Sequence, residues 1–108
     1  MSYSIELSAN FKKEAKRLTK KYPSLKEELA FLFEELEQKP TMGTPLGNDI
    51  YKIRLSIASK NKGKSGGARV LSFVKIIQST VLLFSIYNKG EIDNITLKQI
   101  KELIKDYL

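Results

Sequence analysis

The chain from Ile50 to Gly90 reads IYKIRLSIASKNKGKSGGARVLSFVKIIQSTVLLFSIYNKG. Within it, residues 50–57 alternate between apolar and polar side chains, which is the pattern of a strand with one buried face. A loop rich in Gly, Lys and Ser follows at 59–68, and then come two nearly continuous apolar runs, 70–77 and 81–87. Such runs, separated by a short polar turn, predict a hairpin in the interior of a sheet.

The same stretch carries a concentrated positive charge. It contains eight Lys and Arg residues and no Asp or Glu, whereas the rest of the chain has eleven basic and twelve acidic residues. The formal net charge of +7 therefore comes entirely from these 41 residues. A surface with one sign of charge attracts a polyanion. Because side chains alternate along a strand, Lys52 and Arg54 are expected to project from the same side of it.

One strand and two helices are predicted toward the N-terminus. Residues 2–7 alternate as a half-buried strand does, and apolar residues recur at helical spacing over 11–22 in a strongly basic segment that Pro23 ends. A capping-box pattern at 24–27 begins a second helix, whose many glutamates are expected to be solvated and which Pro40 stops. Together the two helices predict an antiparallel helical hairpin.

A last helix is predicted after a polar connection, because Thr96 and Gln99 form a second capping-box pattern. Its apolar stripe has these members: Leu97, Ile100, Leu103 and Ile104. The fold predicted is α+β, in which an N-terminal strand and helical hairpin pack on a twisted, mostly antiparallel sheet of about four to five strands, followed by a C-terminal helix. We expect one domain over 1–108, with helices on one face of the sheet and Lys52 and Arg54 on a partly open face.

The composition excludes several kinds of chemistry. The sequence has no Cys, and thus no thiolate nucleophile. It also has no His, which is the commonest acid–base side chain and the commonest metal ligand. A metal-dependent nuclease uses clustered carboxylates, which the basic stretch lacks, so neither a metal nor a cofactor is expected. The sequence shows no signal segment and no apolar run of membrane-spanning length, so we expect a cytoplasmic protein without membrane association.

The glycine-rich loop at 63–67 lacks the spacing of a P-loop and precedes a strand rather than a helix. An anion-binding loop is a better interpretation, in which backbone N–H groups and lysines contact phosphates. The alternative is a flexible connection that is basic only for solubility. The lysines of this loop and of the strand before it are candidate RNA contacts: Lys52, Lys60, Lys62 and Lys64.

Four groups from different strands can converge on one phosphate and are the candidate catalytic residues: Arg54, Arg69, Tyr87 and Lys89. Cleavage of an RNA phosphodiester requires a 2′-hydroxyl aligned for in-line attack, stabilisation of charge at phosphorus, and a proton for the leaving oxygen. Arginine binds phosphate oxygens bidentately. A lysine crowded by other cations, or a tyrosine, can take part in the proton transfers.

In four segments the chain resembles the RelE/ParE toxin superfamily, and it is closest to the RelE/HigB-like branch of bacterial type II toxin–antitoxin modules. The segments are 51–54, 63–70, 82–89 and the Thr-capped helix that begins at 96, and the most specific piece is the Lys-x-Gly-Gly-Ala-Arg-Val run. The resemblance implies a small basic toxin that enters the ribosomal A site and cuts mRNA. It also implies an acidic antitoxin, encoded beside the toxin, which silences it. Any oligomer is expected to form mainly through this antitoxin.

Carried over position by position, the resemblance implies that Arg69 stabilises the scissile phosphate. It also implies that Tyr87 and Lys89 correspond to the Tyr/Lys pair that the HigB-like branch has at the end of its last strand. The basic pair on the preceding strand and the loop lysine have these counterparts: Lys52, Arg54 and Lys64. Two alternatives stay open, a ParE-like poison of DNA gyrase and a non-toxic relative that binds RNA or an antitoxin. Exposed apolar residues of the first two helices and of the sheet edge are the expected docking surface for a partner.

Overall fold

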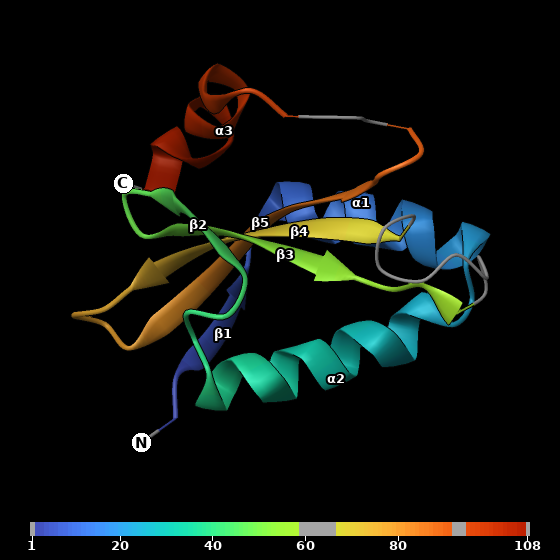
Figure 1. The fold of residues 1–108 in the computed structure, drawn as a ribbon, viewed down its shortest axis with the longest axis horizontal. Coiled ribbons are helices and arrows are strands. Elements are labelled where there is room, and N and C mark those ends of the chain that lie inside the picture. The colour runs from blue at the N-terminus through green and yellow to red at the C-terminus, as the bar shows by residue number, and fades with distance from the viewer. Residues whose placement is uncertain (1, 59–66, 92–94, 108) are drawn as a thin grey trace.

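The computed structural model describes residues 2–58, 67–91 and 95–107, which contain one five-stranded sheet in the order β1-β5-β4-β3-β2 (Figure 1). Strand β1 (Ser4–Leu7) runs parallel to β5 (Thr80–Asn88), and the other neighbours are antiparallel. Those other strands are β2 (Thr44–Gly47), β3 (Ile50–Leu55) and β4 (Ala68–Lys75). The predicted α+β fold with a mostly antiparallel sheet is therefore confirmed.

Helices α1 (Ala9–Lys21) and α2 (Leu25–Gln38) cover one face of the sheet. The Ser8 side chain caps α1, because its Oγ accepts a hydrogen bond from the Phe11 N–H at 3.0 Å. The Phe11 and Phe33 rings, with centroids 6.4 Å apart, join the two helices. The helices and the sheet share one apolar cluster, to which the strands contribute Ile53, Val70, Val81, Leu83 and Ile86.

The start of α2 differs from the prediction. Ser24 has a helical backbone (φ −68°, ψ −19°) rather than the extended one of a capping residue, and its hydroxyl makes no capping bond. The Ser24 Oγ donates instead to Glu28 Oε1 at 3.2 Å, while Glu28 Oε2 accepts the Ala58 N–H at 2.7 Å. The expectation that Glu28 is a solvated side chain is thus wrong, because it ties α2 to the segment after β3.

The C-terminal helix α3 (Leu97–Ile104) lies on the opposite face of the sheet and continues into a short 3₁₀ helix, Lys105–Tyr107. Its predicted capping box is present, and Ile100 and Ile104 are buried. The sheet residues of this second apolar cluster are Ile50, Leu71, Leu82, Phe84 and Tyr87. The expectation that all helices share one face is wrong, because the apolar runs of β4 and β5 leave both faces in need of cover.

Three large apolar residues that were predicted in strands or in the helix stripe are exposed: Ile76, Ile77 and Leu97. Strand β4 ends at Lys75, and residues 76–79 form the turn, where Ser79 adopts a φ of 49°. Of the helices in the described part of the chain, none combines the length and apolar character needed to cross a bilayer.

Candidate nucleic-acid interface

Three of the predicted site residues lie side by side across the three central strands. Arg54 of β3 is paired with Arg69 of β4, and Arg69 is paired with Tyr87 of β5. Residues that are directly opposite on neighbouring strands project to the same face, with Cβ atoms about 5 Å apart. The structure therefore brings Arg54, Arg69 and Tyr87 into one line, which we name the cationic row.

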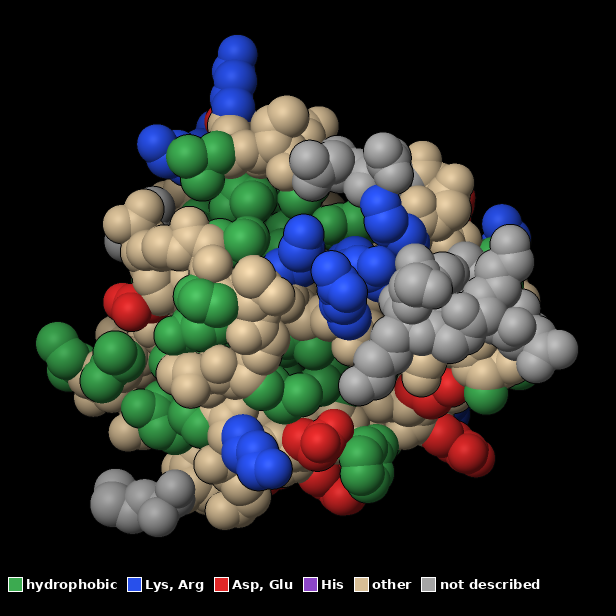
Figure 2. Space-filling view, in the orientation of Figure 1, with side chains coloured by type: hydrophobic (Ala, Val, Ile, Leu, Met, Phe, Trp, Pro, Cys, Tyr) green, Lys and Arg blue, Asp and Glu red, His purple; other side chains and the backbone are tan. Residues whose placement is uncertain are grey.

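The cationic row lies on the face of the sheet that α3 partly covers. Tyr87 belongs to the apolar cluster beneath α3, and so does Leu71, which is paired with Lys52. Lys52 precedes Arg54 by two residues and thus projects to the same side of β3. Figure 2 shows Lys and Arg side chains gathered near the middle of this view of the molecule.

Burial changes along the cationic row. The Arg54 side chain is exposed, whereas Arg69 is only 5% exposed and its Nη1 donates to the backbone oxygen of Ala68 at 3.1 Å. Burial lowers the pKa of the Arg69 guanidinium, the adjacent Arg54 lowers it further, and Tyr87 acts in the opposite direction. Arginine nevertheless keeps its proton in proteins. The row thus holds one exposed cation and one cation that is fixed within the sheet.

Tyr87 is 2% exposed, and this burial raises the pKa of its phenol, while the charge of Arg69 acts to lower it. A raised pKa keeps the phenol protonated at neutral pH. Tyr87 can therefore donate a hydrogen bond or a proton to an oxyanion, but it is poorly suited to act as a base.

Two cations of this face, Lys52 and Arg54, have no acidic partner among the described residues. In the part of the chain that the structure describes, the Lys52 and Arg54 side chains form neither an ion pair nor a hydrogen bond. Ion pairs occur elsewhere, between Arg17 and Glu91, between Lys75 and Glu6, and between Lys105 and Glu102. Like charges directly opposite each other in a sheet are destabilising, and a bound anion relieves that repulsion. The arrangement is suited to a phosphate group.

Lys89, the fourth candidate, lies half-buried in the turn after β5, and its backbone N–H donates to the Gly67 oxygen at 3.0 Å. Its neighbour Asn88 braces this turn, because Asn88 Nδ2 donates to Tyr22 Oη and Asn88 Oδ1 accepts the Gly90 N–H, each at 3.0 Å. Sequence reasoning missed Asn88, since an Asn at the end of an apolar run indicates only a turn. The remaining candidates lie outside the described residues: Lys60, Lys62 and Lys64.

Gly67 is a second residue whose role the sequence did not reveal. A Cβ at this position would clash with the backbone oxygen of Leu55, so only glycine allows the chain entering β4 to pass this close to the end of β3. The close approach holds the first residues of β4 against β3 at the Arg54–Arg69 end of the sheet. From the sequence alone, the Gly66-Gly67 pair indicates a turn or an anion-binding loop equally well and does not indicate a close approach of two strands.

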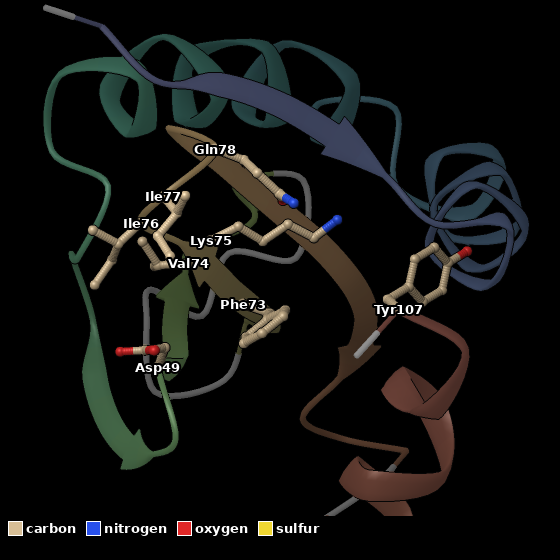
Figure 3. Close-up of a pocket in the computed structure, with 8 residues that line it drawn as sticks. All are labelled: Asp49, Phe73, Val74, Lys75, Ile76, Ile77, Gln78 and Tyr107. Carbon is tan, nitrogen blue, oxygen red and sulfur yellow. The ribbon is translucent and has the colours of Figure 1, made fainter.

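Two pockets among the described residues lie away from the centre of the cationic row. One of them has a volume of about 650 Å³ and lies between the turn that follows β4 and Tyr107, at the far end of β4 from Arg69. Figure 3 shows the residues that line it. Another, of about 620 Å³, lies between α2 and the end of β3 and reaches Arg54. Within the described ranges, no three His, Cys, Asp or Glu side chains are grouped closely enough to hold a metal ion. A patch of cations on a sheet still suits a nucleic-acid phosphate, which proteins contact at the surface.

No protein-family model matches the sequence, but solved structures share its fold. A double Arg-to-Ala mutant of the E. coli toxin RelE in the free state matches over 100% of both chains, with a TM-score of 0.67 and 21% identity. The isolated E. coli RelE toxin matches with a TM-score of 0.61 and 20% identity, over 99% of this chain and 100% of that one. A chain of the RelBE2 toxin–antitoxin complex of Mycobacterium tuberculosis matches with a TM-score of 0.59 and 16% identity, over 82% and 92%. The chain has the RelE-like fold that the resemblance implied.

Proposed function

We propose that this protein is the toxin of a type II toxin–antitoxin system and acts as an endoribonuclease that cuts mRNA on the ribosome. The observation that carries the proposal is the cationic row, which aligns two guanidinium groups and a protonated phenol on one face. The RelE-like fold supports it, since the structures of that fold include toxins and toxin–antitoxin complexes. The presence of both Tyr87 and Lys89 at the end of the last strand in the sequence favours the HigB-like branch, by the resemblance.

In the proposed reaction, the 2′-oxygen of a ribose attacks the adjacent phosphorus and the P–O5′ bond breaks. The products are a 2′,3′-cyclic phosphate and a free 5′-hydroxyl, and no metal is needed. Negative charge increases on the phosphoryl oxygens in the transition state. We assign its stabilisation to Arg54, which is exposed, and to Arg69, whose buried charge acts through a medium of low dielectric constant.

Two protons must move in this reaction, one from the 2′-hydroxyl and one to the 5′-oxygen. Tyr87 keeps its proton at neutral pH, so we assign it to the leaving 5′-oxygen as a donor. Lys89, two residues further along the chain, is the proposed second group in proton transfer. The lysines assigned to the flanking phosphates are Lys52, Lys60, Lys62 and Lys64.

The proposed regulator is an acidic antitoxin encoded beside the toxin. A disordered acidic segment would fold onto the toxin and cover the cationic row, because the Lys52 and Arg54 side chains carry positive charge that no described residue pairs. The double Arg-to-Ala mutant of E. coli RelE has been solved in complex with a peptide of the antitoxin RelBc, which supports a partner of this kind. Action on ribosomes would place the protein in the cytoplasm, and oligomers would form mainly through the antitoxin.

The test compares the wild-type chain with the Arg69→Ala variant. Each is induced in cells, and the 5′ ends of mRNA are mapped on translating ribosomes. We expect cuts at fixed positions within codons with the wild type and a loss of at least about a hundredfold with Arg69→Ala, by analogy with removal of an oxyanion donor. Because Arg69 is buried, far-UV circular dichroism and the melting temperature of the variant must be compared with wild type.

Other outcomes assign other functions. If wild type, expressed in soluble form, produces no codon-positioned cuts, the nuclease proposal is rejected. Inhibition of gyrase supercoiling by the purified protein would then identify a ParE-like poison. Binding of RNA that weakens steeply with salt, without cleavage, would identify a non-toxic RNA-binding relative.

A further inference from the structure

The solvent side of α2 carries an exposed aromatic ring beside a groove. Phe31 lies in the middle of α2 and is 64% exposed, although the opposite side of the helix is core. The groove, of about 620 Å³, separates this side of α2 from the end of β3, and its apolar wall includes Leu32, Met42 and Leu55. A large exposed ring that borders an apolar groove indicates a binding surface.

Two carboxylates flank the ring. Glu27 and Glu35 are four residues before and after Phe31, so all three lie on one stripe of α2. Both glutamates line the groove, and neither carboxylate forms an ion pair or a hydrogen bond with any described residue. They therefore offer unpaired negative charge on either side of an aromatic face.

The other charged residues of the groove are Glu28 and Arg54. The Glu28 carboxylate already accepts hydrogen bonds from Ser24 and Ala58. With three carboxylates and one guanidinium, the groove is acidic, in a chain whose net charge is +7. Away from Arg54, the three carboxylates would repel an acidic antitoxin segment or an RNA phosphate, whereas they would attract a cationic segment.

We propose that this acidic groove (Glu27, Phe31, Leu32, Glu35, Met42 and Leu55) binds an arginine-bearing segment of a basic protein partner. A guanidinium stacks on an aromatic face and donates paired hydrogen bonds to a carboxylate, and the spacing of Phe31 and its two glutamates offers both. The aliphatic part of the same arginine would cover the apolar wall of the groove. The inference goes beyond the proposed nuclease function and does not depend on it.

The test titrates the purified full-length chain with a synthetic peptide of alternating Arg and Leu, and with matched peptides that have Lys or Glu in place of Arg. Calorimetry gives the affinity, and amide chemical shifts locate the peptide. We expect the Arg peptide to shift the signals of Glu27, Phe31 and Glu35, the Lys peptide to bind several-fold more weakly, and the Glu peptide not to bind.

Variants of the groove sharpen the test. The double variant Glu27→Gln with Glu35→Gln, and separately Phe31→Leu, should each lower the affinity for the Arg peptide about tenfold, the scale of one charge-assisted hydrogen bond or one desolvated cation–π contact. The matched control is Glu34→Gln, an exposed glutamate of the same helix that does not line the groove, and its affinity should equal that of the wild type. All these side chains except Glu35 are exposed, and melting temperatures verify that the variants fold.

The proposal is overturned if the double variant binds as tightly as the wild type, if the shifts map to another face, or if Lys serves as well as Arg. Self-association of the wild type that the double variant loses would assign the groove to a second copy of the chain and overturn the proposal too. No RNA is present in these titrations, so a negative result would not contradict the nuclease proposal. Equally, an absence of mRNA cleavage would not contradict the proposal for the acidic groove.

Discussion

Arg54 and Arg69 are paired directly across β3 and β4, and the Arg54 side chain has no acidic partner in the described part of the chain. Like charges in this position destabilise a sheet by up to about 1 kcal/mol. Arg54→Gln should therefore raise the free energy of unfolding slightly while it lowers mRNA cleavage, because a site residue can cost stability. Urea denaturation and ribosome-dependent cleavage measure the two effects. Lower stability in the variant would mean that Arg54 makes a stabilising contact within the protein and is not held in place for an anionic ligand.

The buried phenol of Tyr87 predicts a pH dependence of stability. Its pKa is raised above the ordinary 10.0 by burial, so the unfolded chain loses this proton at a lower pH than the folded one. The contribution to stability is complete below about pH 10 and is lost as the pH rises through the raised value. Urea denaturation should show that wild type loses more stability than Tyr87→Phe between pH 8 and about pH 11. Equal losses in the two proteins would contradict the assignment.

The same substitution tests the proposed role of Tyr87 as a proton donor. Tyr87→Phe keeps the ring in its apolar cluster and removes only the hydroxyl, so the fold should persist at neutral pH. We expect cleavage to fall by about a hundredfold, which is within the range for loss of general acid catalysis. Cleavage at the wild-type rate would remove Tyr87 from the mechanism and leave it a core residue.

Ser72 of β4 is fully buried, and its hydroxyl has no hydrogen-bond partner among the described residues. An unsatisfied buried hydroxyl costs free energy, so Ser72→Ala should raise the free energy of unfolding by about 1 kcal/mol. Ser85 of β5 is the matched control, because it is 3% exposed and its Oγ donates to Glu14 Oε1 at 3.2 Å. Ser85→Ala should lower stability by about 1 kcal/mol. A loss of stability in both variants would show that Ser72 has a partner, such as a buried water.

The sheet and the convergence of the basic residues could be predicted only in part from the sequence. The apolar runs 70–77 and 81–87 have the length and β-branched content of strands, and the turn between them makes them neighbours. The line formed by Arg54, Arg69 and Tyr87 depends on register, and the ladder between β4 and β5 shifts by one residue after Leu71. A shift of that kind leaves no pattern in the sequence.

The position of the C-terminal helix was beyond prediction for another reason. The capping box of 96–99 and the apolar stripe define a helix, but they do not say which face of the sheet it covers. That choice depends on Leu71, Phe84 and Tyr87, which leave apolar surface on the face opposite α1 and α2. At 24–27 a tertiary contact overrides the local capping-box pattern. The Ser24 hydroxyl donates to the Glu28 carboxylate, which also accepts the Ala58 N–H, and so it does not cap the helix.

Glu28 provides the last prediction, because its carboxylate joins α2 to the residues that follow β3. Glu28→Ala removes the acceptor of the 2.7 Å bond from Ala58 and of the 3.2 Å bond from Ser24, and should lower the free energy of unfolding by about 1 kcal/mol. Glu34→Ala, at an exposed site of the same helix, should change it by less than about 0.5 kcal/mol. Amide hydrogen exchange at Ala58 should also become faster in Glu28→Ala alone, since only that variant loses the acceptor of this N–H. If the two variants are equally stable and exchange at Ala58 is unchanged, Glu28 is an ordinary solvated glutamate, as its place in an acidic helix first indicated.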